Sequence, residues 1–119
     1  MKRQRTPKTK SSSSFLVLST WDHGLSANEE AIKILNSGGS SLDAVVKSCM
    51  KTEKENGQRT VGLGGWPDRD GIVTVDAAIM PDDGRAGSVA FVRGVAHPIQ
   101  LAQIVMEKTP HVMLVGEGA

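Results

Sequence analysis

The chain has 119 residues, which allows at most one domain, and its 39% hydrophobic and 3% aromatic content allows only a modest core. Residues 11–119 carry nine Lys and Arg against thirteen acids, so the body has no basic face for nucleic acid. No run of eighteen apolar residues is present, so we expect no membrane span, and the lone Cys49 cannot form an internal disulfide.

Residues 1–14 are basic and then serine-rich, and this composition predicts a disordered tail before a folded part at 15–119. The apolar run Phe15–Leu18 is too short for the core of a secretory signal, so no standard signal peptide is predicted and no compartment is assigned.

Two helices are predicted after a first short strand at Phe15–Ser19. Ser26 and Glu29 have the spacing of a capping box that begins the first helix, and Gly38 ends it. Ser40 and Asp43 repeat the box for the second helix, which we expect to end at Gly57. An apolar stripe along the second helix consists of Leu42, Val45, Val46, Cys49 and Met50.

A glycine- and proline-rich turn region at 59–71 precedes a predicted strand at Ile72–Met80, which we expect to be buried on both faces at its start. A turn at 81–84 joins it to an antiparallel strand at Ser88–Val92. Pro98 begins a third helix, and a last strand follows at Val112–Val115. The order of elements predicts a small α+β fold that stops where a strand-to-helix turn should continue.

The sequence contains no metal or cofactor motif. Gly62–Gly65 follows a helix and precedes Pro67 and a strand, so we interpret it as a structural turn and not as a phosphate loop. The three histidines are scattered, a single cysteine is present, and Asp82-Asp83-Gly84 lacks the other ligands of a calcium loop.

Three residues remain open to two interpretations each. Asp76, in an apolar strand, is either a structural anchor or part of a site, with a structural role favoured. Cys49 lies on an apolar helical stripe, which favours core packing over reactivity. Trp21 follows the first strand beside a glycine, where an indole ring either lines a pocket or covers the core.

Several motifs together resemble the glycosylasparaginase branch of the N-terminal-nucleophile hydrolases. The similarity covers roughly residues 16–119. Its most specific parts are Ser19-Thr20-Trp21, the helix junction of Ser37-Gly38-Gly39 and Leu42-Asp43-Ala44-Val45, Gly64-Gly65-x-Pro67-Asp68 and Asp76-Ala77-x-Ile79-Met80. The stretches Gly87-Ser88-Val89-Ala90 and Met106 to Gly116 extend the similarity. Plant-type asparaginases and isoaspartyl peptidases share the fold but open with His-Gly-Gly, so Ser-Thr-Trp favours the glycosylasparaginase branch.

The resemblance implies a four-layer αββα sandwich of which this chain is the N-terminal part. It also implies a precursor that cleaves itself before a threonine in a His-Asp-Thr sequence, after which that threonine attacks the side-chain amide of a glycosylated asparagine. No threonine of this chain follows His-Asp. We therefore expect no catalytic residue here, no activity of the chain alone, and a missing C-terminal β-chain as its partner.

Among the residues present, the resemblance carries over Trp21 as a substrate-side residue and, more weakly, His23, which stands where the family often has an aromatic ring. No cofactor is implied. Two alternatives remain: a truncated, non-enzymatic paralogue that acts as a binding or structural remnant, and a relative of the L-asparaginases and isoaspartyl peptidases.

Overall fold

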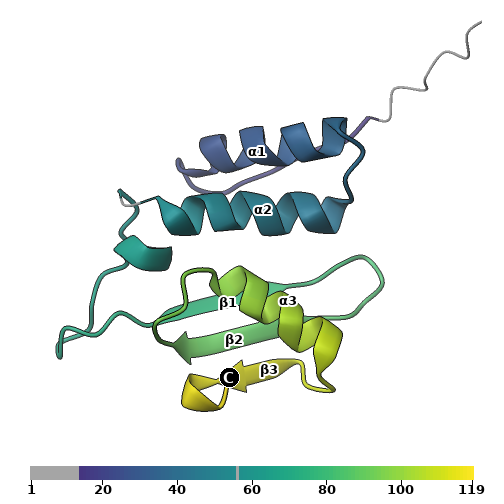
Figure 1. Cartoon of the computed structure of the whole chain (residues 1–119). Coiled ribbons are helices and arrows are strands. Elements are labelled where there is room, and N and C mark those ends of the chain that lie inside the picture. The colour runs from purple at the N-terminus through teal and green to yellow at the C-terminus, as the bar shows by residue number, and fades with distance from the viewer. Residues whose placement is uncertain (1–13, 56) are drawn as a thin grey trace, which may run out of the picture.

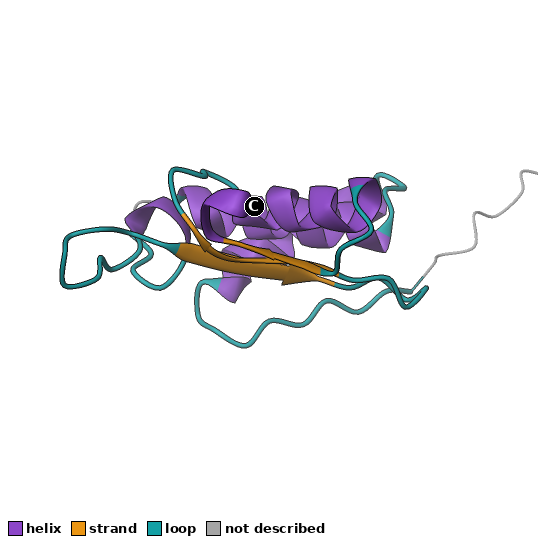
Figure 2. Cartoon of the chain, turned by 90° about the horizontal axis from the view of Figure 1, so that it is seen from below, coloured by secondary structure: helices purple, strands orange, loops and turns teal. Residues whose placement is uncertain are grey.

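The computed structural model describes residues 14–55 and 57–119, so the predicted disordered tail lies outside the described residues apart from Ser14. Three helices form one layer, and a sheet and the extended N-terminal segment lie on the same side of these helices (Figures 1 and 2). The elements are α1 (Gly24–Asn36), α2 (Ser41–Lys54), β1 (Val75–Ile79), β2 (Gly87–Val92), α3 (Pro98–Lys108) and β3 (Met113–Val115). The predicted α+β class is confirmed at this level.

The start of α2 is set by local hydrogen bonds, as predicted. The Asp43 backbone N–H donates to Ser40 Oγ at 3.0 Å, and the Ser40 backbone N–H donates to the Asp43 carboxylate at 3.3 Å. The helix ends at Lys54 and not at Gly57. Among the described residues, no helix has the length and apolar character that crossing a membrane requires.

The capping box predicted for α1 is wrong. The helix begins at Gly24, and Ser26 Oγ instead donates to Glu55 Oε1 at 2.7 Å. Lys51 Nζ donates to the Ser26 carbonyl oxygen at 2.9 Å. These two contacts hold the first turn of α1 against the last turn of α2, so the two helices run antiparallel (Figure 1). The connection turns at Gly38, whose φ of 88° suits glycine.

The sheet has the strand order β1-β2-β3. β1 and β2 pair antiparallel, as predicted, and β2 and β3 pair parallel, with α3 as the crossover between them. The first strand is shorter than the predicted Ile72–Met80. One face of this sheet packs on α3, and the buried core consists of Val46, Ile79, Val89, Val92, Ile99, Ala102, Val105 and Met106.

The expectation that β1 is buried on both faces at its start is wrong. Residues alternate along β1, and Asp76 is exposed. Asp76 Oδ1 accepts a hydrogen bond of 2.7 Å from the backbone N–H of Phe91, which has a φ of 55° at an irregularity in the pairing of the two strands. A non-glycine residue in this conformation is costly, so the carboxylate supports the bulge, in line with the favoured structural role.

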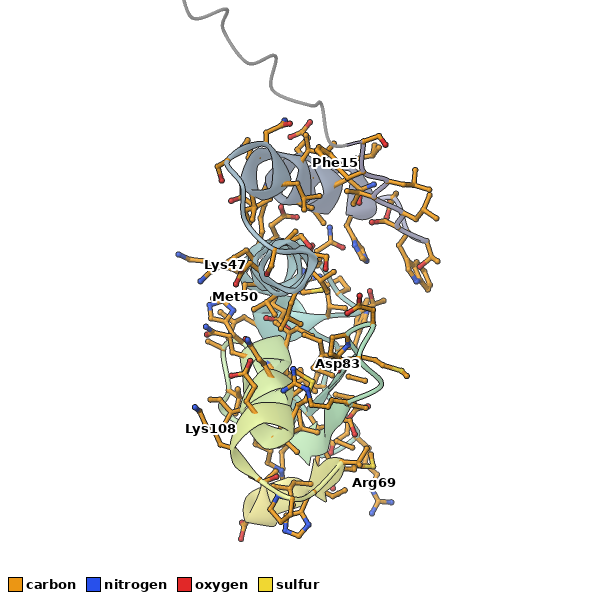
Figure 3. The ribbon with its side chains drawn as sticks, turned by 90° about the vertical axis from the view of Figure 1, so that its right-hand side faces the viewer. Phe15, Lys47, Met50, Arg69, Asp83 and Lys108 are labelled. Atoms are coloured by element: carbon orange, nitrogen blue, oxygen red, sulfur yellow. The ribbon has the colours of Figure 1, made fainter. Side chains whose placement is uncertain are left out.

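The predicted strand at Phe15–Ser19 is also wrong. This segment is extended, but no described strand pairs with it. In Figure 3 Phe15 lies on one side of the helix pair and Lys47 points from α2 to the other side. A strand needs a hydrogen-bonded neighbour, and within the described sheet β1 has a neighbour on one side only. The local sequence therefore has the composition of a strand without the partner that makes one.

The face of the sheet opposite α3 carries large apolar side chains with exposed fractions between 53% and 72%, namely Met80, Met113 and Val115. An exposed apolar sheet face promotes association. We expect the isolated 119-residue chain to self-associate at micromolar concentration, as checked by size-exclusion chromatography with light scattering. Cooperative unfolding of a soluble monomer at that concentration contradicts this prediction.

Candidate functional site

A cavity of about 830 Å³ lies between the N-terminal segment, the inner faces of α1 and α2, residues 59–66 and strand β1. This volume is within the range of small-molecule sites. The apolar part of the cavity lies along α1 and α2 and is lined by Ala27, Ala31, Leu35, Ala44 and Val45. Val45, part of the predicted apolar stripe, is 49% exposed because it faces this space.

The polar end of the cavity lies where α1 begins and α2 ends. The contacts of Ser26 with Lys51 and Glu55 bring these two helix ends together. Residues 59–66 follow α2 directly, so they lie at the same end as the turn that precedes α1 (Figure 1). The lining residues Trp21 and His23 belong to that turn, and Arg59, Thr60 and Trp66 belong to the segment after α2.

Trp21 and His23 stand in that turn, and the structure brings the two predicted residues together. Their rings are stacked, with planes 5° apart and centroids 6.3 Å apart. The indole is 65% exposed and is not part of the buried core, which disfavours the alternative that it covers the core. Both side chains line the cavity. Their contact with a substrate stays a prediction.

The turn before α1 is held by the close approach of Ser19 to Gly24. A Cβ at Gly24 would lie 2.2 Å from Ser19 Cβ, so a side chain is excluded there. Ser19 Oγ is also hydrogen-bonded to Asn28 Oδ1 on the first turns of α1. The backbone N–H of Gly24 donates to the Trp21 carbonyl at 2.9 Å. These contacts hold the backbone of the turn that carries Trp21.

The glycine-rich stretch at Gly62–Gly65 is a structural turn, as predicted: a 3₁₀ turn spans Gly62–Gly64. It packs on the last turn of α2 so closely that a Cβ at Gly62 would lie 2.1 Å from the Glu53 carbonyl oxygen. This contact holds the glycine-rich turn, which lines the cavity, against α2.

Glu53, on the cavity wall, is a buried carboxylate that the sequence reasoning missed. Its Oε1 accepts from the backbone N–H of Ile99 at 2.9 Å, and its Oε2 lies 3.2 Å from His97 Nδ1. Burial raises the pKa of Glu53 above its ordinary value, against the opposing effect of the Ile99 and His97 hydrogen bonds. The sequence offered one sign of this burial: Glu53 lies seven residues after Val46 and therefore on the same face of α2.

The described residues that line the cavity include groups that can bind a ligand, but they do not include a complete set of catalytic residues. Thr20, Thr60 and Thr74 line the cavity, and within the described part of the chain none of them is hydrogen-bonded to a histidine or a carboxylate. Across residues 14–55 and 57–119, no three His, Cys, Asp or Glu side chains group as a metal site would require. The arrangement can hold a ligand between aromatic and apolar surfaces.

Cys49 lines the cavity and is partly buried. Burial, and then the negative charge of Glu53, raise the pKa of the Cys49 thiol. Since the thiolate is the reactive form, we expect Cys49 to react more slowly with a disulfide reagent than a free cysteine at pH 7–8. The rate should still be rising with pH where that of free cysteine has levelled off. A pH–rate profile that coincides with that of free cysteine contradicts the prediction.

Comparison with known proteins shows the family to which the chain belongs. The family model described as Asparaginase matches residues 17–119, and the chain therefore belongs to the asparaginase family. The predicted resemblance to glycosylasparaginases is confirmed by two relatives named N(4)-(β-N-acetylglucosaminyl)-L-asparaginase. The one from Elizabethkingia miricola is 53% identical over 114 residues, which are 96% of this chain and 34% of that protein.

The second relative, from Rattus norvegicus, is 47% identical over 107 residues, 87% of this chain and 30% of its own length. A Rattus norvegicus protein named isoaspartyl peptidase/L-asparaginase is 43% identical over 96 residues, 78% of this chain and 28% of its own length. The chain thus spans about a third of the length of the curated relatives it matches.

Proposed function

We propose that this chain is the N-terminal α-chain part of an autoprocessed threonine-nucleophile amidohydrolase that cleaves the side-chain amide of glycosylated asparagine. Membership of the asparaginase family and 53% identity to a protein named for this activity support the substrate class. The nucleophilic threonine belongs to the part outside these 119 residues. The chain supplies a binding wall and is inactive alone.

The observation that carries the proposal is the unfilled space on the sheet side of α1 and α2. The extended residues Leu16–Ser19 border it on one side and β1 on the other, and neither has a strand partner across the gap in the described structure. The apolar faces of α1 and α2 border the same space. Such a gap fits added strands, because they would pair with the backbone of both borders and cover the apolar faces.

We infer that the missing β-chain fills this gap and extends the sheet, and that further layers over the open sheet face complete the four-layer sandwich. The remainder of a protein about three times as long supplies enough chain. The new strands would end beside Trp21, His23 and Thr60, where a freed N-terminal threonine could meet the substrate.

In the proposed reaction the hydroxyl oxygen of the threonine attacks the side-chain amide carbon, and its own α-amine takes the proton. The C–N bond then breaks and the glycosylamine leaves with that proton. Water hydrolyses the resulting acyl-enzyme and releases aspartate. Trp21, stacked on His23, orients the substrate from the α-chain side.

The length of the transcript and of the mature chains in the source cells tests the proposal first. A reading frame that continues to His-Asp-Thr supports it, whereas a frame that stops at Ala119 leaves the truncated paralogue. The completed protein should then release aspartate from N-acetylglucosaminyl-asparagine. The 43% identity to an isoaspartyl peptidase/L-asparaginase makes free asparagine and an isoaspartyl dipeptide the comparison substrates.

Side-chain variants test the role of Trp21. In the completed protein, Trp21→Ala should lower kcat/KM for the glycosylated substrate at least about tenfold, since a stacked, exposed ring at the cavity edge is lost. Leu25→Ala is the matched control, because Leu25, on the first turn of α1 just after the Trp21 turn, is 75% exposed and does not line the cavity. Equal effects of the two substitutions argue against a substrate contact of Trp21.

A further inference from the structure

The second tryptophan of the chain lies on the same cavity as the first. The sequence contains only two tryptophans, Trp21 and Trp66, and both line this cavity. Trp66 is 72% exposed, and the guanidinium carbon of Arg59 lies 5.9 Å from the centroid of its ring. An aromatic ring this exposed loses apolar contact with the protein and is available to a ligand.

The backbone around Trp66 is held in place by hydrogen bonds on both sides. The Trp66 backbone N–H donates to the Arg59 carbonyl at 2.9 Å. Downstream, Asp68 Oδ1 accepts from the backbone N–H groups of Asp70 at 2.9 Å and Ile72 at 3.0 Å, and the Asp68 N–H donates to the Ile72 carbonyl. Pro67 limits the backbone between these anchors.

This arrangement gives the polar end of the cavity a second aromatic wall. The stacked Trp21 and His23 come from the turn before α1, while Trp66 and Arg59 come from the segment after α2. A wall whose backbone is fixed before binding costs little to order, which favours its use in recognition.

We propose that Trp66 and Arg59 bind the N-acetylglucosamine ring of the substrate and so select glycosylated over free asparagine. This inference rests on the proposed function, because it assigns the sugar-binding wall of the same site. A pyranose ring presents a face of C–H bonds that packs on the indole, and the Arg59 guanidinium supplies donors for the hydroxyl and acetamido oxygens. Free asparagine has no group that reaches this wall.

The test compares two substrates in the completed protein, in which this chain is joined by the remainder of the molecule. Trp66→Ala should lower kcat/KM for N-acetylglucosaminyl-asparagine about three- to tenfold and leave kcat/KM for asparagine within about twofold. Trp66→Phe should restore most of the loss because it keeps an aromatic face. Leu63→Ala is the matched control, since Leu63 is 56% exposed on the adjacent turn and does not line the cavity.

Two results overturn the inference: Trp66→Ala lowers kcat/KM equally for both substrates, as expected if the ring only packs against the rest of the protein, or it lowers neither. If the wild type hydrolyses neither substrate, the proposed function fails, and calorimetric titration with N-acetylglucosaminyl-asparagine decides the inference separately. Weaker binding to Trp66→Ala than to the wild type and Leu63→Ala then supports it. Equal binding to all three, or no binding to the wild type, overturns it.

Discussion

Substitution of Gly62 by alanine is expected to destabilise the fold by roughly 3–5 kcal/mol. Gly62 has a φ of 64°, which an L side chain adopts only at a cost. Its added Cβ would lie 2.1 Å from the carbonyl oxygen and 2.5 Å from the Cα of Glu53. Both are backbone atoms at the end of α2, so no flexible side chain is available to move aside.

The matched control for this substitution is Gly57→Ala. Among the described residues beyond its chain neighbours, no atom lies within 4 Å of the position of a Cβ at Gly57, and its φ is not in the left-handed range. In the completed protein, urea unfolding followed by circular dichroism should therefore show a large loss for Gly62→Ala and a change within about 1 kcal/mol for Gly57→Ala. Equal unfolding midpoints for Gly62→Ala and the wild type would show that the turn can move away from α2.

Removal of the Glu53 carboxyl is the second large effect that we expect. Glu53→Ala leaves the backbone N–H of Ile99 without its acceptor and the ring of His97 without its hydrogen-bond partner in a largely buried place, which should cost at least about 2 kcal/mol. Glu53→Gln keeps an oxygen for the Ile99 N–H and should cost less. Glu30→Ala is the control, since its ion pair with Lys33 is on the surface and contributes little.

The same carboxyl makes stability depend on pH. Its pKa in the folded chain is raised above the ordinary value near 4.5, so the native state binds more protons than the unfolded state between these two values. Its contribution is complete below the unfolded pKa and is lost as pH rises through the folded pKa. The groups that face it are His97 and Cys49.

A comparison with the neutral variant isolates this contribution. Across the window above pH 4.5, the free energy of unfolding of the wild type should fall relative to that of Glu53→Gln as the pH rises. Urea unfolding of the completed protein, as wild type and as Glu53→Gln, at a series of pH values measures the difference. A constant difference across the window, or one of opposite sign, contradicts the raised pKa.

The elements that local sequence could predict are those fixed by near neighbours. The capping box of α2 joins Ser40 to Asp43, three residues apart, and Pro98 begins α3. The same box pattern failed at α1, because Ser26 binds Glu55, a residue 29 positions away. Sequence spacing alone cannot decide between a near and a distant partner for a serine hydroxyl.

The site was also predictable only in part, because some of its residues are positioned by contacts between segments that are distant in the sequence. Trp21 was found because it lies in a short motif that resembles the family, and His23 because it stands where the family often has an aromatic ring. Trp66 enters the site through the packing of Gly62 on α2. Phe15–Ser19 has the composition of a strand, yet pairing depends on a neighbour that its own residues do not specify.

The contact between Glu53 and the Ile99 N–H also bears on the order in which the chain folds. α3 begins without a side-chain cap from its own flanking residues, and the acceptor at its start comes from α2, 46 positions earlier. Closing so long a loop costs entropy before the contact gives any gain. The first turn of α3 should therefore become protected from hydrogen exchange only after the α1–α2 hairpin has docked, which makes the two halves of the chain one cooperative unit.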